Sequence, residues 1–165
     1  MARLSERQWI ELYTALEKKL YNAVYRWVWD AADAQDIVQE AFLRCWRIRH
    51  RVREHGVSAL LYRTALRLAS NQRRRRRLWQ MVAFDDNEAA VAAPEVFPRP
   101  VQLAFDRLPD ALKRVLVLSD VLGMSYAEIA TVLGVREGTI GSRRNRALAR
   151  LRKDLEAQGM KSNDD

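Results

Sequence analysis

The sequence contains little of what stabilises small secreted domains or holds metal ions. Among its 165 residues there are one cysteine, Cys45, and two histidines, so neither an internal disulfide nor a cysteine-based zinc site can form. No apolar run reaches the roughly 18 residues that a membrane span requires. Residues 1–19 hold no uninterrupted apolar segment, so a secretory signal is not expected. We therefore expect a cytoplasmic protein without a bound metal, another cofactor or a small-molecule substrate.

Glycine and proline are also scarce, and their positions divide the chain. Residues 1–80 contain Gly56 and no proline, whereas 81–100 hold three of the four prolines. Proline cannot continue a helix and disfavours helix in the residue before it. No alternating pattern long enough for a strand is present. The fold class predicted is all-α, with two small helical domains at 1–80 and 101–156, a flexible linker at 81–100 and a disordered tail at 157–165.

The net charge of +8 conceals an uneven distribution. Residues 1–80 carry 17 basic and 8 acidic residues, a net +9, whereas the segment 81–100 carries a net −3. Within the C-terminal part, residues 136–153 hold seven basic residues and one acid, Glu137. Concentrated basic zones of this kind indicate a polyanionic partner, of which nucleic acid is the first to test.

The C-terminal part carries the clearest local signals. Pro109 and Asp110 suit a helix start, Ser125 and Glu128 form a capping box, and Gly134 suits a left-handed helix end. A further helix follows from Thr139, and its spacing predicts an inward stripe of Ile140, Ala147, Leu148, Leu151 and Leu155. This order, a helix, a short turn with glycine and then an arginine-rich helix, is typical of a helix-turn-helix, whose second helix enters the DNA major groove.

The polar faces of that last helix have the chemistry of base and phosphate recognition. Arginine pairs with guanine, asparagine with adenine, and the remaining arginines neutralise phosphates. The alternative is a solvated basic face on an ordinary helical bundle. Gly141, inside the helix, indicates either drift or a close approach of the backbone to DNA, and the residues leave both open.

In the N-terminal part, apolar residues at helical spacing across Leu20–Ile48 predict two helices, of which the second has an acidic side. Asp33 is expected as its N-cap, and Asp36, Gln39 and Glu40 follow on an exposed face. In a basic domain these acids indicate a protein-binding surface, with compensation of the helix dipole as the alternative.

The segment 58–80 predicts one long helix with an apolar stripe of Leu60, Leu61, Thr64, Ala65 and Leu68. The run Arg73–Arg77 wraps all faces of a helix, so it is expected to lie along phosphates rather than in a core; nuclear targeting and a membrane surface are alternatives. Four of the five tryptophans are expected in the core, and Trp79 beside the arginine run is left open. Cys45 is expected to be an inert core thiol, and His50 and His55 loop residues.

Three segments resemble extracytoplasmic-function (ECF, group 4) sigma factors of bacterial RNA polymerase. DAADAQDIVQEAFLRCWR (30–47) and SALLYRTALRLASNQRRRRR (58–77) resemble region 2 of that family. The segment 105–155, which includes GMSYAEIATVLGVREGTIGSRRNRALARLR, closely resembles region 4. The resemblance implies an alternative sigma factor that binds core polymerase and directs promoter recognition, without enzymatic activity.

The resemblance also implies roles for individual positions. Binding to the β′ clamp helices of the polymerase core falls on the acidic helix, at Asp33, Asp36, Gln39 and Glu40. Recognition of the −10 element falls on Tyr62, Arg63, Arg67, Asn71, Gln72, Arg73, Arg74, Arg75, Arg76 and Arg77. Recognition of the −35 element falls on Arg136, Thr139, Ser142, Arg143, Asn145, Arg146 and Arg150. The family also implies contact with the β flap, and an anti-sigma factor that can hold the protein at the inner membrane.

The sequence departs from the family pattern at Leu60, Arg67, Asn71 and Gly141, and its loop at 48–57 is short and basic; these departures leave the promoter sequence open. The competing functional hypothesis is a stand-alone helix-turn-helix regulator, whose first domain would serve dimerisation or ligand sensing. An enzyme acting on nucleic acid is disfavoured because the sequence shows no clustered carboxylates with metal spacing and no nucleophile–base pair.

Overall fold

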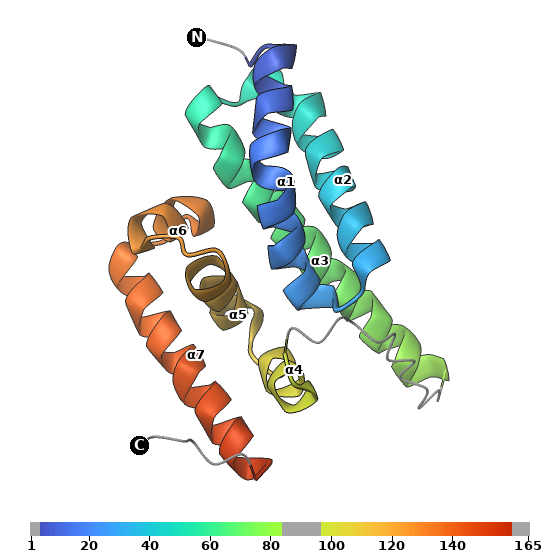
Figure 1. Ribbon diagram of the computed structural model, residues 1–165, viewed down its shortest axis with the longest axis vertical. Coiled ribbons are helices and arrows are strands. Elements are labelled where there is room, and N and C mark those ends of the chain that lie inside the picture. The colour runs from blue at the N-terminus through green and yellow to red at the C-terminus, as the bar shows by residue number, and fades with distance from the viewer. Residues whose placement is uncertain (1–3, 84–96, 160–165) are drawn as a thin grey trace. The chain divides into compact units, whose positions relative to one another are not determined.

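The computed structural model describes residues 4–83 and 97–159, and every regular element in these ranges is a helix. The chain divides into two compact units, 1–93 and 94–165. The first holds α1 (Glu6–Val28), α2 (Ala31–Ile48) and α3 (Val57–Ala83), and the second holds α4 (Arg99–Asp106), α5 (Asp110–Leu116), α6 (Tyr126–Leu133) and α7 (Glu137–Ala157) (Figure 1). The predicted all-α fold with two helical domains is confirmed.

The first unit is a three-helix bundle around a core of aliphatic and aromatic side chains. Ser5 begins α1 with a capping box completed by Gln8. Only Trp29 and Asp30 connect α1 to α2, and Trp29 makes that turn with a left-handed φ of 52° while its N–H donates to Tyr25 O at 2.8 Å. The short 3-10 turns η1 (Arg49–Arg51) and η2 (Glu54–Gly56), which contain His50 and His55, lead into α3. Fully buried side chains include Leu20, Val24, Trp27, Leu61 and Leu66.

Cys45 lies in this core, as the sequence predicted. Its side chain is 1% exposed, and burial raises the pKa of its thiol, which the hydrogen bond to Thr64 Oγ1 at 3.7 Å partly opposes. Since the thiolate is the reactive form, Cys45 is an inert thiol.

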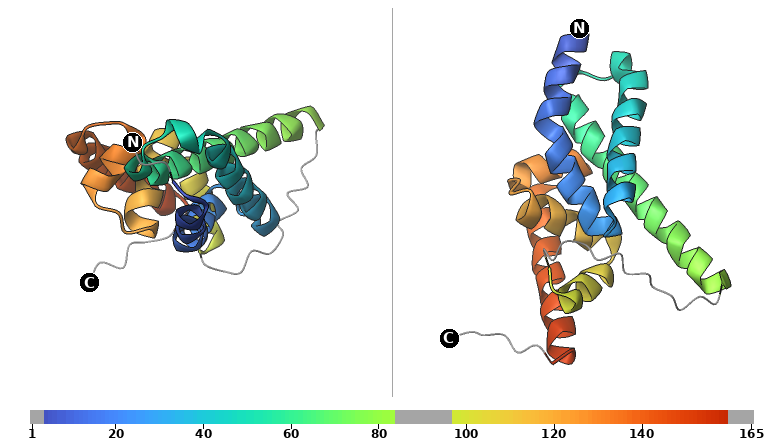
Figure 2. Two further views of the ribbon diagram at one scale, coloured as in Figure 1. Left: turned by 90° about the horizontal axis from the view of Figure 1, so that it is seen from above. Right: turned by 45° about the vertical axis from the view of Figure 1, so that its right-hand side comes forward.

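Helix α3 is longer than the bundle that it packs into. Its buried positions recur at helical spacing from Val57 through Leu61, Ala65 and Ala69 and stop at Ser70. The remaining residues to Ala83 run past the ends of α1 and α2 (Figure 2). The predicted apolar stripe was partly wrong, because the buried face is rotated: Tyr62 is 2% exposed, whereas Leu60, Thr64 and Leu68 are only half-buried.

The second unit packs four helices around Leu112, Val115, Leu118, Ile129 and Ile140. A π-helical turn, η3 (Val117–Val121), extends α5, and Gly123, with φ 66°, follows its end. The predicted inward stripe of α7 is only partly correct. Ile140 and Ala147 are fully buried, but Leu148 is 38% exposed and Leu151 and Leu155 are half-buried.

The linker proposed at 81–100 lies for the most part outside the described residues, which exclude 84–96. Its two ends are helical, because α3 continues to Ala83 and α4 begins at Arg99 with Pro100 in its first turn. Proline is accommodated there since the first-turn N–H groups have no intrahelical acceptor. Likewise α7 continues to Ala157, and 160–165 of the proposed tail lie outside the described residues.

Candidate polymerase-binding and DNA-binding surfaces

The acidic helix begins three residues earlier than the sequence suggested. Asp30, with an extended backbone, is the N-cap of α2, and its Oδ1 accepts the N–H of Asp33 at 2.8 Å. The prediction that Asp33 is the N-cap is therefore wrong, since Asp33 lies inside the first helical turn. Its carboxylate is consequently available to α3 rather than to its own backbone.

Asp33 is held by two side chains of α3. Its Oδ2 lies 2.6 Å from Arg76 Nη2 and accepts a hydrogen bond of 3.4 Å from Gln72 Nε2. Arg76 Nη2 also lies 3.7 Å from Asp30 Oδ2. The start of the acidic helix is thus tied to the arginine run.

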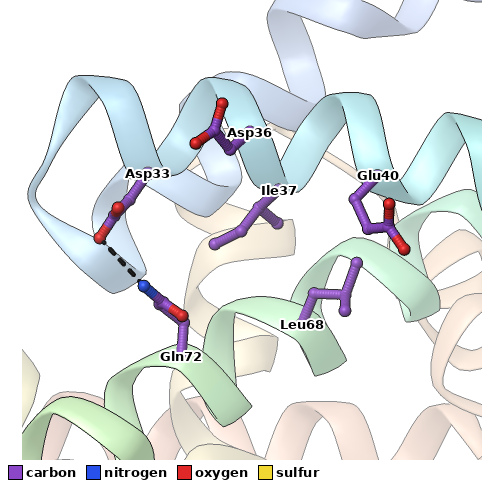
Figure 3. Close-up of a pocket in the computed structure, with 6 residues that line it drawn as sticks. All are labelled: Asp33, Asp36, Ile37, Glu40, Leu68 and Gln72. Atoms are coloured by element: carbon purple, nitrogen blue, oxygen red, sulfur yellow. Dashed lines mark hydrogen bonds between the residues drawn. The ribbon is translucent and has the colours of Figure 1, made fainter.

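Farther along α2, the carboxylates rim a shallow pocket between α2 and α3. Its lining consists of Asp33, Asp36, Ile37, Glu40, Leu68 and Gln72 (Figure 3). Asp36 is exposed, and Glu40 is paired with Arg44 one turn on, at 2.5 Å. Gln39 is exposed beside them but does not line the pocket. Carboxylates around the apolar pair Ile37 and Leu68 have the chemistry to bind a basic protein surface.

Helix α3 separates the residues predicted to contact the −10 element into two groups. Arg73 Nη1 donates to Trp27 O at 3.2 Å, and Arg76 and Gln72 reach α2, so these three lie on the side that continues from the buried Tyr62. Arg73 and Arg76, which the sequence assigned to phosphates, thus contact α1 and α2 of their own domain without entering its core, and Tyr62, which it assigned to the −10 element, is buried. The opposite side, by helical spacing, presents the exposed residues Arg63, Arg67, Asn71, Arg74 and Arg75. Arg77 is also exposed.

The helix-turn-helix of the second unit is built as its local sequence predicted. Ser125 Oγ accepts the N–H of Glu128 at 3.3 Å, and Glu128 Oε2 accepts the N–H of Ser125 at 2.7 Å, which completes the capping box. Gly134, with φ 67°, ends α6, and its N–H donates to Ala130 O at 2.8 Å. Arg136 then precedes the first turn of α7.

One exposed side of α7 carries most of the predicted −35 residues. Thr139, Arg143, Arg146 and Arg150 recur every three or four residues with Ser142 beside them, next to the buried Ile140 and Ala147; Thr139 and Arg143 are half-buried and the other three are exposed. Ser142 Oγ donates to Thr139 O at 3.1 Å, within the helix. We call these five residues the α7 arginine stripe. Asn145 is exposed as well, but at about 100° per residue it lies roughly a third of a turn from the stripe.

Arg144, which lies between two residues of the stripe in sequence, pairs with an aspartate of η3. Arg144 Nη2 lies 2.6 Å from Asp120 Oδ1, and Arg144 Nε donates to Asp120 Oδ2 at 3.0 Å. The hydrogen bond from Arg144 lowers the pKa of Asp120, and Ser119 adds a short hydrogen bond to the same carboxylate. This fork fastens α7 to η3. Spacing along α7 gave no signal of it, since the partners are 24 residues apart.

Comparisons with known proteins agree with this division into two surfaces. The family model described as Sigma-70 region 2 matches residues 12–78, and the one described as Sigma-70, region 4 matches residues 99–151. The chain is 32% identical over 160 residues to the ECF RNA polymerase sigma factor SigL of Mycobacterium tuberculosis, which covers 90% of this chain and 89% of the relative. This chain belongs to the sigma-70 family, in its ECF group.

Further relatives extend the match. SigE of Mycolicibacterium smegmatis is 31% identical over 154 residues, and this chain spans 60% of its length. Two solved structures share the fold. The first is CnrH in complex with the cytosolic domain of CnrY, with a TM-score of 0.69 and 24% identity; the match covers 93% of this chain and 90% of the chain in that structure. The sigma factor RpoE of Bartonella quintana, in complex with the anti-sigma factor NepR, has a TM-score of 0.70 and 21% identity and covers 91% of this chain and 98% of its own.

For this sigma factor, the two matches separate the competing hypotheses. A stand-alone helix-turn-helix regulator would account for the second unit alone, whereas region 2 covers nearly all of α1 to α3. The function is that of an alternative sigma factor rather than a stand-alone regulator. Within residues 4–83 and 97–159, no helix is long and apolar enough to cross a membrane, and no group of three or more metal-ligating side chains is present.

Proposed function

We propose that this sigma factor binds core RNA polymerase through the exposed acids of α2 and places α3 and α7 on the two promoter elements. The observation that carries the proposal is the pocket rimmed by Asp36 and Glu40 in region 2, on a domain that is otherwise strongly basic. Neither of these two carboxylates is taken up by α3, in contrast to Asp33. The partner would be the β′ clamp helices, with Gln39 as a neighbouring polar contact and Asp33 contributing at the edge.

The DNA contacts in this proposal are those that the fold leaves exposed or half-buried. Arg63, Arg67, Asn71, Arg74 and Arg75 on α3 would face the −10 element, and Arg77 would contact phosphate beside them. The α7 arginine stripe would lie in the −35 major groove, with Arg136 on a phosphate and Asn145 at the edge of the groove. Tyr62, Gln72, Arg73 and Arg76 would support α3 rather than contact DNA directly.

The remaining parts of the proposal follow from the family. The region 4 unit would also contact the β flap, and an anti-sigma factor would hold the protein inactive, as the solved relatives with CnrY and NepR suggest. We propose a cytoplasmic, nucleoid-associated protein that can be retained at the inner membrane by that regulator. It would have no catalytic activity, cofactor or small-molecule substrate of its own.

The test is reversal of the two pocket carboxylates. The double variant Asp36→Lys and Glu40→Lys, assayed with core polymerase by competition binding and by transcription in vitro, should lose polymerase affinity by at least tenfold, because unlike charges would become like charges. Its helical circular dichroism should be unchanged. Glu11→Lys, an exposed acid on α1, is the matched control and should bind normally. Unchanged affinity in the double variant would refute the proposal.

A further inference from the structure

Arg144 occupies a position of α7 where helical spacing predicts an apolar side chain. Ile140, Arg144, Ala147 and Leu151 follow one another at four, three and four residues, the spacing of a helix face that packs against its neighbours. Ile140 and Ala147 are fully buried, and the Arg144 side chain is 31% exposed. This arginine therefore belongs to the packed face of α7 rather than to the α7 arginine stripe.

The partners of Arg144 come from two other elements. Its Nε and Nη2 donate to the carboxylate of Asp120 in η3, at 3.0 and 2.6 Å, and it also interacts with the phenol of Tyr126, the first residue of α6. A Cβ added at Gly141 would lie 3.5 Å from Tyr126 Cε2, so the tyrosine ring is close to α7 within one turn of Arg144. One side chain thus links α7 to α6 and to the extension of α5 (Figure 1).

Asp120 reaches α7 from an irregular turn. In η3 the N–H of Leu122 donates to Val117 O, five residues back, at 3.1 Å. A π turn holds one residue more than an α turn, so it changes the direction of the side chains that follow it, and such turns are frequent at functional sites. Ser119 Oγ donates a further hydrogen bond to the Asp120 carboxylate. The acceptor of the fork is therefore held by its own element as well as by Arg144.

The geometry of this pair matters more than its strength. Both side chains are about one-third exposed, and ion pairs of that exposure contribute little to stability. Hydrophobic contact has no preferred direction, whereas two parallel hydrogen bonds from an arginine to a carboxylate fix the orientation of both groups. In coiled coils a polar residue in the packed face defines how the helices align, at a cost in stability. The fork is suited in the same way to define the rotation of α7 about its axis.

The rotation of α7 decides which groups of the stripe meet the bases. Arg144 lies midway along the stripe, between Thr139 and Arg150. An arginine that reads a base edge with two hydrogen bonds must lie in the plane of that base. A small rotation of α7 would move Arg146 out of that plane while leaving its charge near the phosphates. The loss would therefore appear in discrimination between sequences more than in affinity for DNA as such.

We propose that the fork between Asp120 and Arg144 is a determinant of −35 specificity, in which Arg144 is a positioning residue that holds α7 at the rotation required by its base contacts. The proposal rests on the function proposed above, because it takes the −35 contacts from the α7 arginine stripe. Direct contact with a phosphate is the other role open to an arginine of α7. Two engaged nitrogen atoms and a place between Ile140 and Ala147 favour positioning.

The experiment measures binding of holoenzyme with the full chain to two duplexes, one with the preferred −35 sequence and one unrelated. The readout is the ratio of the two affinities, because partial unfolding lowers both affinities equally. Arg144→Lys keeps the charge and loses the two parallel hydrogen bonds, and it should lower the ratio about fivefold. Asp120→Ala should do the same, and the double variant should be no worse than either single variant, because the two residues act as one unit. Helical circular dichroism should be unchanged.

Asp154→Asn is the matched control. It removes the other ion pair of α7, in which Arg107 Nη1 lies 3.9 Å from Asp154 Oδ2, beyond the last residue of the stripe. This variant should keep the wild-type ratio. The proposal is overturned if Arg144→Lys keeps the ratio, since charge alone would then suffice, as it does for a phosphate contact. It is also overturned if the fork variants lose affinity equally for both duplexes, or if Asp154→Asn lowers the ratio as much as they do.

The wild type separates this proposal from the function on which it rests. A wild-type holoenzyme without any preferred −35 sequence would contradict the proposed function, and the role of the fork with it. A wild type that discriminates between the two duplexes, together with fork variants that discriminate equally well, would overturn the role of the fork alone.

Discussion

The two arginine-rich helices of this sigma factor, α3 and α7, use their cations differently. In α3 five arginines are consecutive, so they project all around the helix, and the fold itself takes Arg73 and Arg76. In α7 most of the arginines are spaced, so Arg143, Arg146 and Arg150 share one side, whereas Arg144 is engaged by Asp120. A count of arginines therefore overstates the DNA contacts of α3 more than those of α7.

The largest effect is expected from the centre of the α7 arginine stripe. Arg146→Ala should weaken the free energy of binding to the preferred −35 sequence by about 1–3 kcal/mol and relax specificity at one base pair, because the base that Arg146 contacts loses the arginine's hydrogen-bond donors. The measurement is holoenzyme binding to a library of −35 variants. Arg152→Ala, an exposed arginine off the stripe, is the control and should change binding little. An equal loss on all sequences would make Arg146 a phosphate contact instead.

The next comparison separates the two sides of α3. In the double variant Arg74→Ala and Arg75→Ala, the slope of log K for DNA binding against log salt concentration should become shallower by about two, since each exposed arginine displaces about one counterion. Its stability should be unchanged. Arg73→Ala with Arg76→Ala should instead destabilise the first unit by about 1–2 kcal/mol, through the lost hydrogen bond to Trp27 O and the ion pair with Asp33.

Tryptophan fluorescence provides the measurement, because all five tryptophans lie within residues 1–83 and denaturant unfolding followed this way reports on the first unit alone. If both double variants weakened DNA binding equally and left stability intact, the division of α3 into two sides would be wrong.

The parts of the site that the sequence predicted are those fixed by local chemistry. The capping box of Ser125, the left-handed Gly134 and the buried Cys45 depend on neighbours within a few residues or on simple hydrophobicity, and all three are confirmed. Two of the errors concern long-range partners. The buried Tyr62 and the engaged Arg76 depend on how α3 lies against α1 and α2, and a single helix pattern does not contain that information. The N-cap of α2 is instead a local choice between neighbouring aspartates, Asp30 and Asp33.

A smaller effect is expected at Gly141, where the sequence left drift and close approach to DNA undecided. A Cβ added there would meet Tyr126 Cε2 at 3.5 Å, an ordinary contact, so the fold does not require glycine. Gly141→Ala should stabilise the second unit by about 0.5–1 kcal/mol through helix propensity and leave −35 binding unchanged. Circular dichroism at 222 nm in denaturant and holoenzyme binding to −35 DNA are the two measurements. A loss of DNA affinity without a loss of stability would show that the backbone approaches the DNA closely.

The smallest effect is expected at the link between η3 and α7. The pKa of Asp120 is lowered by Arg144, so the folded state favours the carboxylate, and this stabilisation is present above the ordinary aspartate pKa and is lost as the pH falls through the lowered value. Because both partners are about one-third exposed, the contribution at neutral pH should be only about 0.5 kcal/mol. Asp120→Asn should therefore be less stable than wild type at pH 7, and the difference should vanish towards pH 3. The measurement is denaturant unfolding followed at 222 nm, with tryptophan fluorescence as an internal control that the first unit is unaffected. A constant difference across that range would mean that the fork contributes through its shape and packing rather than through the charge of Asp120.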